Sequence, residues 1–254
     1  MIRSMNMKLD VSQDSKFGIS RSSLLHGFLM EKLDAGFADK MHAMSMRPYS
    51  QNLLRESDGN WIWQIKTISD DAWVNISRVF EECNSIFLRH CNAEIKILSK
   101  EITETDFSRM FEKAYFSDSA SRFVEIEFVT PTAFKSNGAY INYPDVKMLL
   151  SSLIRKYDLC SEKTAVYDEK LMEEIIKNTS IVKYNLRSTH FHLEGVKIPS
   201  FVCKITLKTT GHSNMACMVN MLAEFGTYSG VGIKNALGMG ALRIIEQRKV
   251  YANE

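Results

Sequence analysis

Long apolar runs, paired cysteines and proline-rich segments are all missing from this sequence of 254 residues. Because no stretch of about eighteen consecutive apolar residues is present, a membrane-spanning helix is excluded. Residues 1–15 also lack the apolar core of a signal peptide, so we expect a cytoplasmic protein without a membrane partner. The five cysteines are scattered and none forms a C-x-x-C pair. Neither a disulfide framework nor a metal site is therefore expected, and no cofactor is predicted.

Charge of either sign is not in excess: 32 Lys and Arg residues stand against 30 Asp and Glu residues, a formal net charge of +2. This balance neither requires nor forbids a nucleic-acid partner, because a local positive patch need not change the total. Apolar residues make up 45% of the chain, which is ample for a buried core. The length fits two compact domains of about 120 residues each, or one large domain.

Hydrophobic periodicity in the first half predicts the order strand, helix, strand, strand, helix, strand. We expect a serine at position 20, 22 or 23 to cap the first helix. The expected strands cover residues 2–9, 47–54, 61–68 and 93–102, and the expected helices begin near residues 20–23, 36 and 70.

The second half repeats this order more loosely, with expected strands at 123–129, 180–193, 200–208 and 241–245 and helices at 145–157 and 213–225. We therefore predict an α+β protein of two tandem ferredoxin-like (RRM-like, βαββαβ) domains with a C-terminal glycine-rich loop. The predicted N-terminal domain is residues 1–115, and the predicted C-terminal domain is residues 116–254.

Glycine is sparse except in GVGIKNALGMG, residues 230–240, which holds four of the twelve glycines. A dinucleotide-binding G-x-G-x-x-G loop is excluded, because Asn235 replaces the third glycine and a predicted helix precedes the stretch. Glycines permit positive φ, which lets backbone amides point at an anion, and Lys234 adds a positive charge. A simple turn into the last strand is the alternative. The residues expected at an RNA-binding loop are Gly230, Gly232, Lys234, Asn235, Gly238 and Gly240.

Residues 230–240, taken together with the tandem βαββαβ pattern, resemble the C-terminal glycine-rich loop of the RAMP superfamily. More narrowly, the chain resembles the Cas6 family of CRISPR-associated endoribonucleases. LLHGFLMEKL (24–33) and DKMHAMSMRPYS (39–50) are similar to the first helix, the histidine and the next strand of that family. EIEFVTPTAF (125–134) resembles the strand that opens the second domain. The resemblance runs nearly from end to end.

The resemblance implies a metal-independent endoribonuclease that cuts CRISPR repeat RNA (pre-crRNA) into guide RNAs. A ribose 2′-OH would attack the adjacent phosphate and leave a 2′,3′-cyclic phosphate and a 5′-OH. This reaction needs a base, an acid and cationic groups around the phosphate. CRISPR repeat RNA is thus the expected partner, and other CRISPR effector subunits and a homodimer are also considered.

His42 matches the histidine position of the family, and the resemblance implies that it acts as acid or base near neutral pH. Arg47 is expected to supply the cation at the phosphate, with Lys40 as a second candidate. From the residues alone, His42 is a surface histidine in a methionine-rich loop, and both cations are solvated charges.

This chain departs from the family pattern at Met30, where some members carry a tyrosine on the first helix. Methionine cannot transfer protons. His26 lies one helical turn earlier, and we propose it as a substitute partner, with Tyr49 as a further candidate. A helix-surface or interdomain position of His26 is the alternative.

Two later strands carry basic side chains. His190 and His192 are two residues apart and so share one face of a strand, where they either contact RNA or a metal or are simply exposed. Lys183, Arg187 and Lys204 are expected to form a basic face for the duplex stem of a repeat hairpin, since proteins recognise such RNA through backbone shape. Solvated charges are the alternative.

Two other functions stay open at this point. A non-catalytic RAMP subunit would hold guide RNA within an effector complex without cutting it. A ferredoxin-like scaffold or small-ligand protein would have no role with RNA. Cyclic-phosphate ends produced from a repeat RNA in EDTA would separate the enzyme from both.

Overall fold

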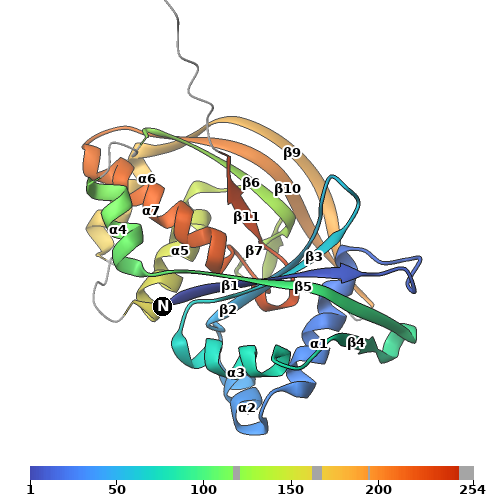
Figure 1. The fold of residues 1–254 in the computed structure, drawn as a ribbon. Helices are drawn as coiled ribbons and strands as arrows, with labels where there is room; N and C mark the ends of the chain where they lie inside the picture. The colour runs from blue at the N-terminus through green and yellow to red at the C-terminus, as the bar shows by residue number, and fades with distance from the viewer. Residues whose placement is uncertain (117–120, 162–167, 194, 246–254) are drawn as a thin grey trace, which may run out of the picture.

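Two β-sheets, each with helices packed on one face, form the body of the protein (Figure 1). This computed structural model describes residues 1–116, 121–161, 168–193 and 195–245. The first sheet has the strand order β2-β3-β1-β5-β4, and the second has the order β11-β6-β10-β9. In both sheets the first and third strands of a βαββαβ unit lie at the centre. The predicted fold of two tandem ferredoxin-like units is therefore confirmed.

The N-terminal unit packs alternating side chains of its strands against its helices. Met5 and Met7 of β1 point to the same side as Trp63 of β3, whose ring meets Phe80 edge-on at a centroid distance of 5.4 Å. The elements of this unit are β1 (Ile2–Asp10), α1 (Ser22–Lys32), α2 (Ala35–Ala43), β2 (Tyr49–Arg55), β3 (Trp61–Thr67), α3 (Asp70–Phe80), β4 (Ser85–Leu88) and β5 (Ala93–Thr105).

The start of α1 differs from the prediction of a serine cap. Arg21 occupies the N-cap position and makes no side-chain cap bond. The hydroxyl of Ser22 instead donates to the Ile19 carbonyl at 2.7 Å, because residues 19–21 already form a 3₁₀ turn that leads into the helix. The two following helices do have side-chain caps, Asp34 for α2 and Ser69 for α3.

The C-terminal unit repeats the same arrangement with two added helices and a hairpin. Strand β10 pairs antiparallel with β6 on one side and with β9 on the other, and α5 and α7 cover one face of the sheet. The elements are α4 (Phe107–Phe116), β6 (Phe123–Thr132), β7 (Phe134–Ser136), β8 (Ala139–Ile141), α5 (Val146–Cys160), α6 (Glu169–Asn178), β9 (Thr179–Leu193), β10 (Val196–Thr209), α7 (Ser213–Ser229), a 3₁₀ turn η3 (Asn235–Leu237) and β11 (Leu242–Ile244).

Helix α4 connects the two units but packs with the second. Met110 and Ala114 are buried in the core that also contains Leu153 of α5 and Phe225 of α7. Most of α4 thus lies ahead of the boundary predicted after residue 115, while its buried side chains pack with the second unit.

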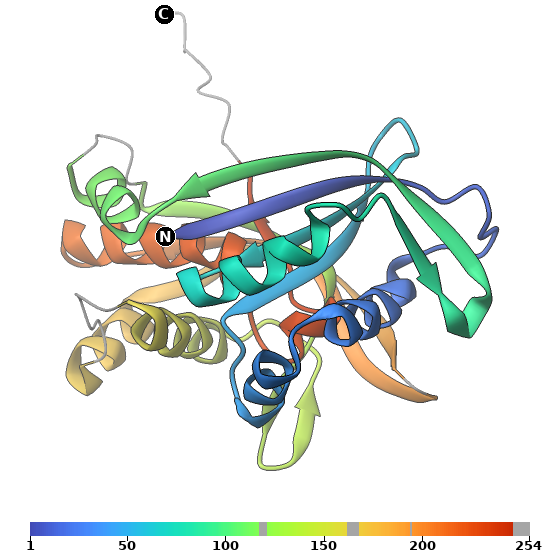
Figure 2. The same cartoon turned by 60° about the horizontal axis from the view of Figure 1, so that its bottom comes forward.

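The segment between α7 and β11 crosses from one unit to the other. Figures 1 and 2 show it beside α1 and β2 of the N-terminal unit, although it belongs by sequence to the C-terminal one. Within the part of the chain that the structure describes, no helix is both long and apolar enough to cross a membrane.

Candidate nucleic-acid interface and cleavage site

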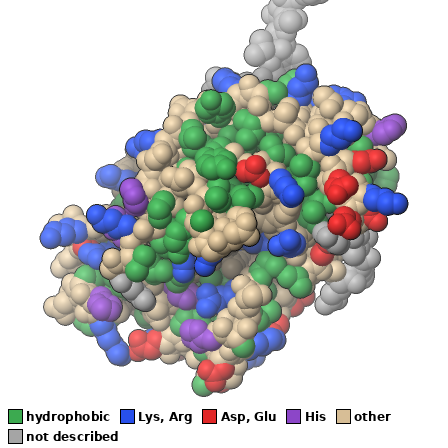
Figure 3. Space-filling view, turned by 180° about the vertical axis from the view of Figure 1, so that it is seen from behind, with side chains coloured by type: hydrophobic (Ala, Val, Ile, Leu, Met, Phe, Trp, Pro, Cys, Tyr) green, Lys and Arg blue, Asp and Glu red, His purple; other side chains and the backbone are tan. Residues whose placement is uncertain are grey.

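A cleft of about 750 Å³ lies where the two units meet. Four segments line it: residues 45–49 before and in β2, residues 134–136 of β7, residues 145–156 of α5 and its cap, and residues 229–236 after α7. The face seen in Figure 3 is hollowed near its centre, and Lys and Arg side chains gather around the hollow. The cleft therefore has walls from both halves of the chain.

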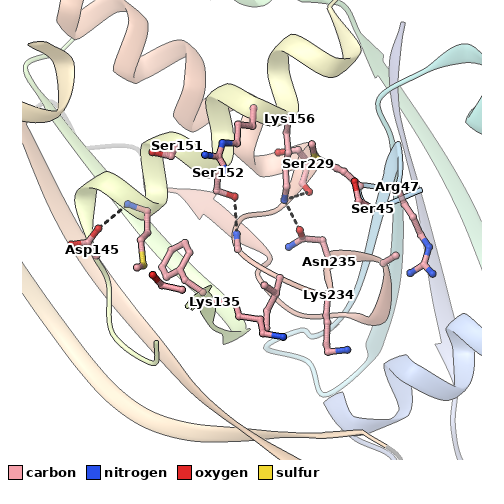
Figure 4. Close-up of a pocket in the computed structure, with 18 of the residues that line it drawn as sticks. Ser45, Arg47, Lys135, Asp145, Ser151, Ser152, Lys156, Ser229, Lys234 and Asn235 are labelled. Carbon is pink, nitrogen blue, oxygen red and sulfur yellow. Dashed lines mark hydrogen bonds between the residues drawn. The ribbon is translucent and has the colours of Figure 1, made fainter. Parts of the chain in front are cut away.

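The cleft walls are strongly basic. Asp145 is the only carboxylate among the described lining residues, and it caps α5 by accepting a bond from the Met148 amide at 2.7 Å. Lys135 and Lys234 extend toward the same side of the cleft (Figure 4). Such a concentration of positive charge favours a polyanionic ligand. The cationic lining residues are Arg47, Lys135, Lys147, Arg155, Lys156 and Lys234.

The four glycines of residues 230–240 all have positive φ, between 63° and 106°. A side chain on Gly238 would overlap Ser22 of α1, and one on Gly240 would overlap the Val231 carbonyl. A Cβ on Gly232 would likewise meet the backbone of Ala133. These glycines therefore allow close contact of the loop with itself and with the N-terminal unit.

Asn235 differs from the expectation of a side chain available to RNA. Its Nδ2 donates to the carbonyls of Val231 at 2.9 Å and Met239 at 3.1 Å, and its Oδ1 accepts from the ammonium of Lys156. With 9% of the residue exposed, the amide serves to hold the loop together. Lys234 instead has a left-handed backbone conformation and lines the cleft.

His26 and Tyr49 form a buried pair at the edge of the cleft. The Tyr49 hydroxyl lies 3.1 Å from His26 Nδ1 and 3.5 Å from the sulfur of Met30. Burial, together with the nearby charges of Arg47 and His42, lowers the pKa of His26 to about 4. Burial raises the pKa of Tyr49, so the hydroxyl keeps its proton at neutral pH.

His26 lies inside the protein wall and not on the helix surface. Its imidazole is neutral at pH 7 and contacts the Tyr49 hydroxyl, and its role as a substitute partner in proton transfer stays a prediction. Tyr49, by contrast, extends from β2 and places its hydroxyl next to the sulfur of Met30 on α1. Met30 occupies the position at which some relatives were expected to carry a tyrosine.

His42 is exposed in the last turn of α2, and Arg47 lies close by in the following loop. Arg47 Nε donates to the carbonyl of Met41 at 3.0 Å, which fixes the guanidinium beside the residue that precedes His42. Lys40 is directed elsewhere: its ammonium forms an ion pair with Asp71 of α3 at 2.5 Å. Arg47 is thus held at the end of α2 that carries His42, whereas the ammonium of Lys40 is directed toward α3.

The basic strands form a different surface. Thr206 pairs with Lys183, Lys204 with Asn185 and Val202 with Arg187, so the three predicted basic side chains share the sheet face opposite to the helices. Lys204 also lies 3.7 Å from Glu127 of β6. His190 and His192 are both exposed on β9. No group of three or more metal-binding side chains occurs among the described residues.

None of the cations on the wall formed by α5 was predicted. Lys147, Ser151 and Arg155 are spaced at i, i+4 and i+8, which aligns them along one helix face over about 12 Å. That spacing is visible in the sequence. Lys156 was not predictable in this way, because it follows Leu153 and Ile154 on the buried side of the helix.

Solved structures with the same arrangement define the class of protein. A Cas6 product complex matches with a TM-score of 0.80 and 18% identity, covering 97% of this chain and 100% of that one. Cas6 of Thermus thermophilus matches with a TM-score of 0.72 and 18% identity, covering 96% and 98% of the two chains. The chain has the fold of the CRISPR-associated Cas6 proteins.

Sequence relatives establish the family. The family described as CRISPR-associated endoribonuclease Cas6 matches residues 126–242. A Cas6 endoribonuclease of Streptococcus thermophilus is 30% identical over 224 residues, 88% of this chain and 90% of that protein. One of Mycobacterium tuberculosis is 29% identical over 222 residues, 87% of this chain and 70% of that protein. This chain belongs to the Cas6 family and is an endoribonuclease.

Proposed function

We propose that this endoribonuclease cuts CRISPR repeat RNA to release guide RNAs, with the RNA bound along the basic cleft and cleaved beside His42 and Arg47. The observation that supports it most is the location of Arg47, which lines the cleft next to the end of α2 that carries His42, while the other walls carry four further solvent-accessible cations. The five cations of the cleft that solvent reaches, Arg47, Lys135, Lys147, Arg155 and Lys234, suit a ribose–phosphate chain bound along it.

In the proposed reaction the ribose 2′-OH attacks the adjacent phosphorus, and the bond to the 5′-oxygen breaks. His42 is exposed and free to reach the RNA, and it takes the proton from the 2′-OH or gives one to the leaving oxygen. Arg47 stabilises the negative charge on the phosphate oxygens in the transition state. The products are a 2′,3′-cyclic phosphate and a 5′-OH, and the RNA itself supplies the nucleophile, so no metal is required.

The buried His26–Tyr49 pair lies inside the wall of the cleft, where it connects α1 with β2. Because both groups are neutral at pH 7, they stabilise the contact between α1 and β2 without competing for the phosphate. Tyr49 also lines the cleft, although it is 2% exposed and its hydroxyl is directed toward His26. We retain Tyr49 as a hydrogen-bonding contact and His26 as its partner.

The two units divide the task in this proposal. Residues 1–115 contribute the cleavage residues, and residues 116–254 contribute most of the cleft and the basic strands. Lys183, Arg187 and Lys204 face away from the helices and are proposed to contact the phosphates of a repeat stem. Association with other CRISPR effector subunits, or as a homodimer, is a further proposal that light scattering of the purified chain with and without RNA will test.

A cleavage assay in excess EDTA tests the function. Purified protein is incubated with the repeat RNA encoded beside its own gene, and the new ends are analysed by mass spectrometry. We expect one cut per repeat with a 2′,3′-cyclic phosphate and a 5′-OH. Cleavage that needs magnesium or manganese would contradict the mechanism, and tight binding without any cut would favour a non-catalytic RNA-binding subunit.

A further inference from the structure

The C-terminal end of α7 is enclosed between the two units. The amide of Gly230 donates to the Gly226 carbonyl at 3.0 Å and makes the last bond of the helix. The carbonyls of Thr227, Tyr228 and Ser229 have no partner within the helix, as at every helix end, and their enclosure requires other donors.

Side chains from both units supply these donors. From the N-terminal sheet, Lys66 Nζ donates to Thr227 O at 2.8 Å, and Ser50 Oγ donates to Tyr228 O at 2.5 Å. From the C-terminal unit, Lys156 Nζ on α5 donates to Ser229 O at 3.3 Å and to the next carbonyl, that of Gly230, at 2.8 Å. We call this arrangement of Ser50, Lys66 and Lys156 on the end of α7 the α7 latch.

Enclosure of a lysine ammonium is unfavourable, and here Lys156 is buried and Lys66 is half-buried. Lys156 is 6% exposed, and burial lowers its pKa to about 7, while burial lowers the pKa of Lys66 to about 8. The negative end of the helix dipole offsets part of this cost. The three hydrogens of the Lys156 ammonium also match its three acceptors, the carbonyls of Ser229 and Gly230 and the Oδ1 of Asn235. Figure 4 shows Lys156 beside Ser229 and Asn235. An apolar side chain would fill the space but satisfy none of them.

The latch is connected through the glycine loop to α1 and to β2, the strand that begins two residues after Arg47. Lys156 fixes Asn235, which begins η3, and the Ala236 carbonyl then accepts from Gln51 Nε2 of β2 at 3.1 Å. The same Gln51 Nε2 donates to the carbonyl of Ser22 in α1 at 2.8 Å. The two elements that carry Tyr49 and His26 are thereby attached to a loop that the other unit holds in place.

We propose that Lys156 and Lys66 are positioning residues that fix the two units against each other through the end of α7, and so keep the cleavage residues in register with the basic wall of the cleft. Neither lysine needs to touch RNA for this role. The structural part of this inference is independent of the enzyme reaction, and only its catalytic part rests on the proposed function.

Hydrogen–deuterium exchange of the RNA-free protein tests the structural part. We compare Lys156→Met, Lys156→Gln and Lys66→Met with Lys170→Met, an exposed lysine at the start of α6. We expect amides of residues 235–240 and of the first turn of α1 to exchange at least about tenfold faster in the latch variants only, with the cores of both sheets still protected. Unchanged exchange in α1, or faster exchange throughout, would overturn the inference.

Single-turnover cleavage at saturating repeat RNA tests the catalytic part. Small displacements of reacting groups reduce rates strongly, so we expect each Lys→Met variant to be roughly tenfold slower, with RNA affinity within about threefold of the wild type. Because both lysines act through one helix end, the Lys66→Met/Lys156→Met double variant should be little slower than the worse single variant. Multiplicative losses, or a normal rate in Lys156→Met, would contradict a shared latch. If the wild type cuts no repeat RNA, the proposed function fails while the exchange result still decides the latch.

Discussion

The two histidines near the proposed cleavage site differ in their exposure to solvent. His42 is exposed at the end of α2, whereas His26 is 8% exposed and bonded to Tyr49. The sequence placed both near one site, but it could not show that one faces solvent and the other the protein interior. That difference assigns the proton transfer to His42 in our proposal.

At this residue, replacement of His42 by alanine is expected to slow cleavage by about a hundred- to ten-thousand-fold, because a general acid or base is removed. RNA affinity should stay within a few-fold, since the imidazole contributes little area to the interface. The measurement is single-turnover cleavage alongside filter binding. His190→Ala, an exposed histidine on β9, is the matched control and should cut normally. A well-folded His42→Ala protein with wild-type activity would refute the assignment.

The buried His26 predicts a dependence of stability on pH. Its pKa is about 4 when folded and about 6.5 when unfolded, so the unfolded chain binds more protons between these values. The contribution of His26 is complete above pH 6.5 and is lost as the pH falls toward 4, at a cost of about 3 kcal/mol in the free energy of unfolding. Urea unfolding of wild type and His26→Gln across this range measures the difference.

Tyr49→Phe is the matched control for that series, because it keeps His26 in the wall and should keep the acid sensitivity. Equal pH dependence of wild type and His26→Gln would show that the imidazole is solvated in the folded protein.

At the scale of elements, periodicity predicted those that form the two βαββαβ units and the added helix α2, and missed the other additions. Strand β4 has four residues, and β7 and β8 have three each, too few to show a period. Helix α6 buries only Ile175 fully, and α4 lies on the expected domain boundary. These additions were missed because each is short or buries few of its side chains.

The glycine loop was predicted from composition, but its contacts were not. Gly238 has a φ of 106° and faces Ser22, so Gly238→Val is expected to combine backbone strain of about 1–3 kcal/mol with a steric overlap between the units. We expect a lower melting temperature, faster opening of the loop and weaker RNA binding. Gly195→Val is the control, because Gly195 has a φ of 80° and open space around it.

A Gly195→Val protein that loses as much stability as Gly238→Val would show that strain alone matters and that the contact with Ser22 does not.

Lys234→Ala tests the effect of charge in the same loop without adding bulk. We expect an unchanged melting temperature and a salt slope of RNA binding reduced by about one unit.

At the scale of the whole molecule, a net charge of +2 conceals an uneven distribution. The cleft gathers six cations, while much of the compensating acid lies on other elements. The total charge therefore gave no indication of a polyanion site, and only the fold brings Arg47 and the lysines of α5 and β7 together.

We expect the affinity for repeat RNA to fall steeply with salt because of these cations. The Lys135→Ala/Lys147→Ala double variant should reduce the slope of log affinity against log salt by about 0.7–0.9 for each phosphate that it no longer neutralises. Equilibrium binding from low to moderate salt measures the slope. Lys170→Ala, on the exposed start of α6, should leave it unchanged. Equal slopes in all three proteins would show that the RNA lies outside the cleft.

The hydrogen bond of Gln51 with Ala236 has a consequence for synthesis on the ribosome. Gln51 is 1% exposed and accepts a bond from the Trp63 indole at 2.8 Å, but one of its amide donors is satisfied by a residue made 185 positions later. At about 5–20 residues per second, the N-terminal sheet waits roughly ten seconds or more for this partner. Until then the Gln51 side-chain amide lacks one of its acceptors, and the part of β2 that the glycine loop covers is exposed to solvent. The nascent chain is therefore most vulnerable to misfolding and to proteases just before its glycine loop emerges.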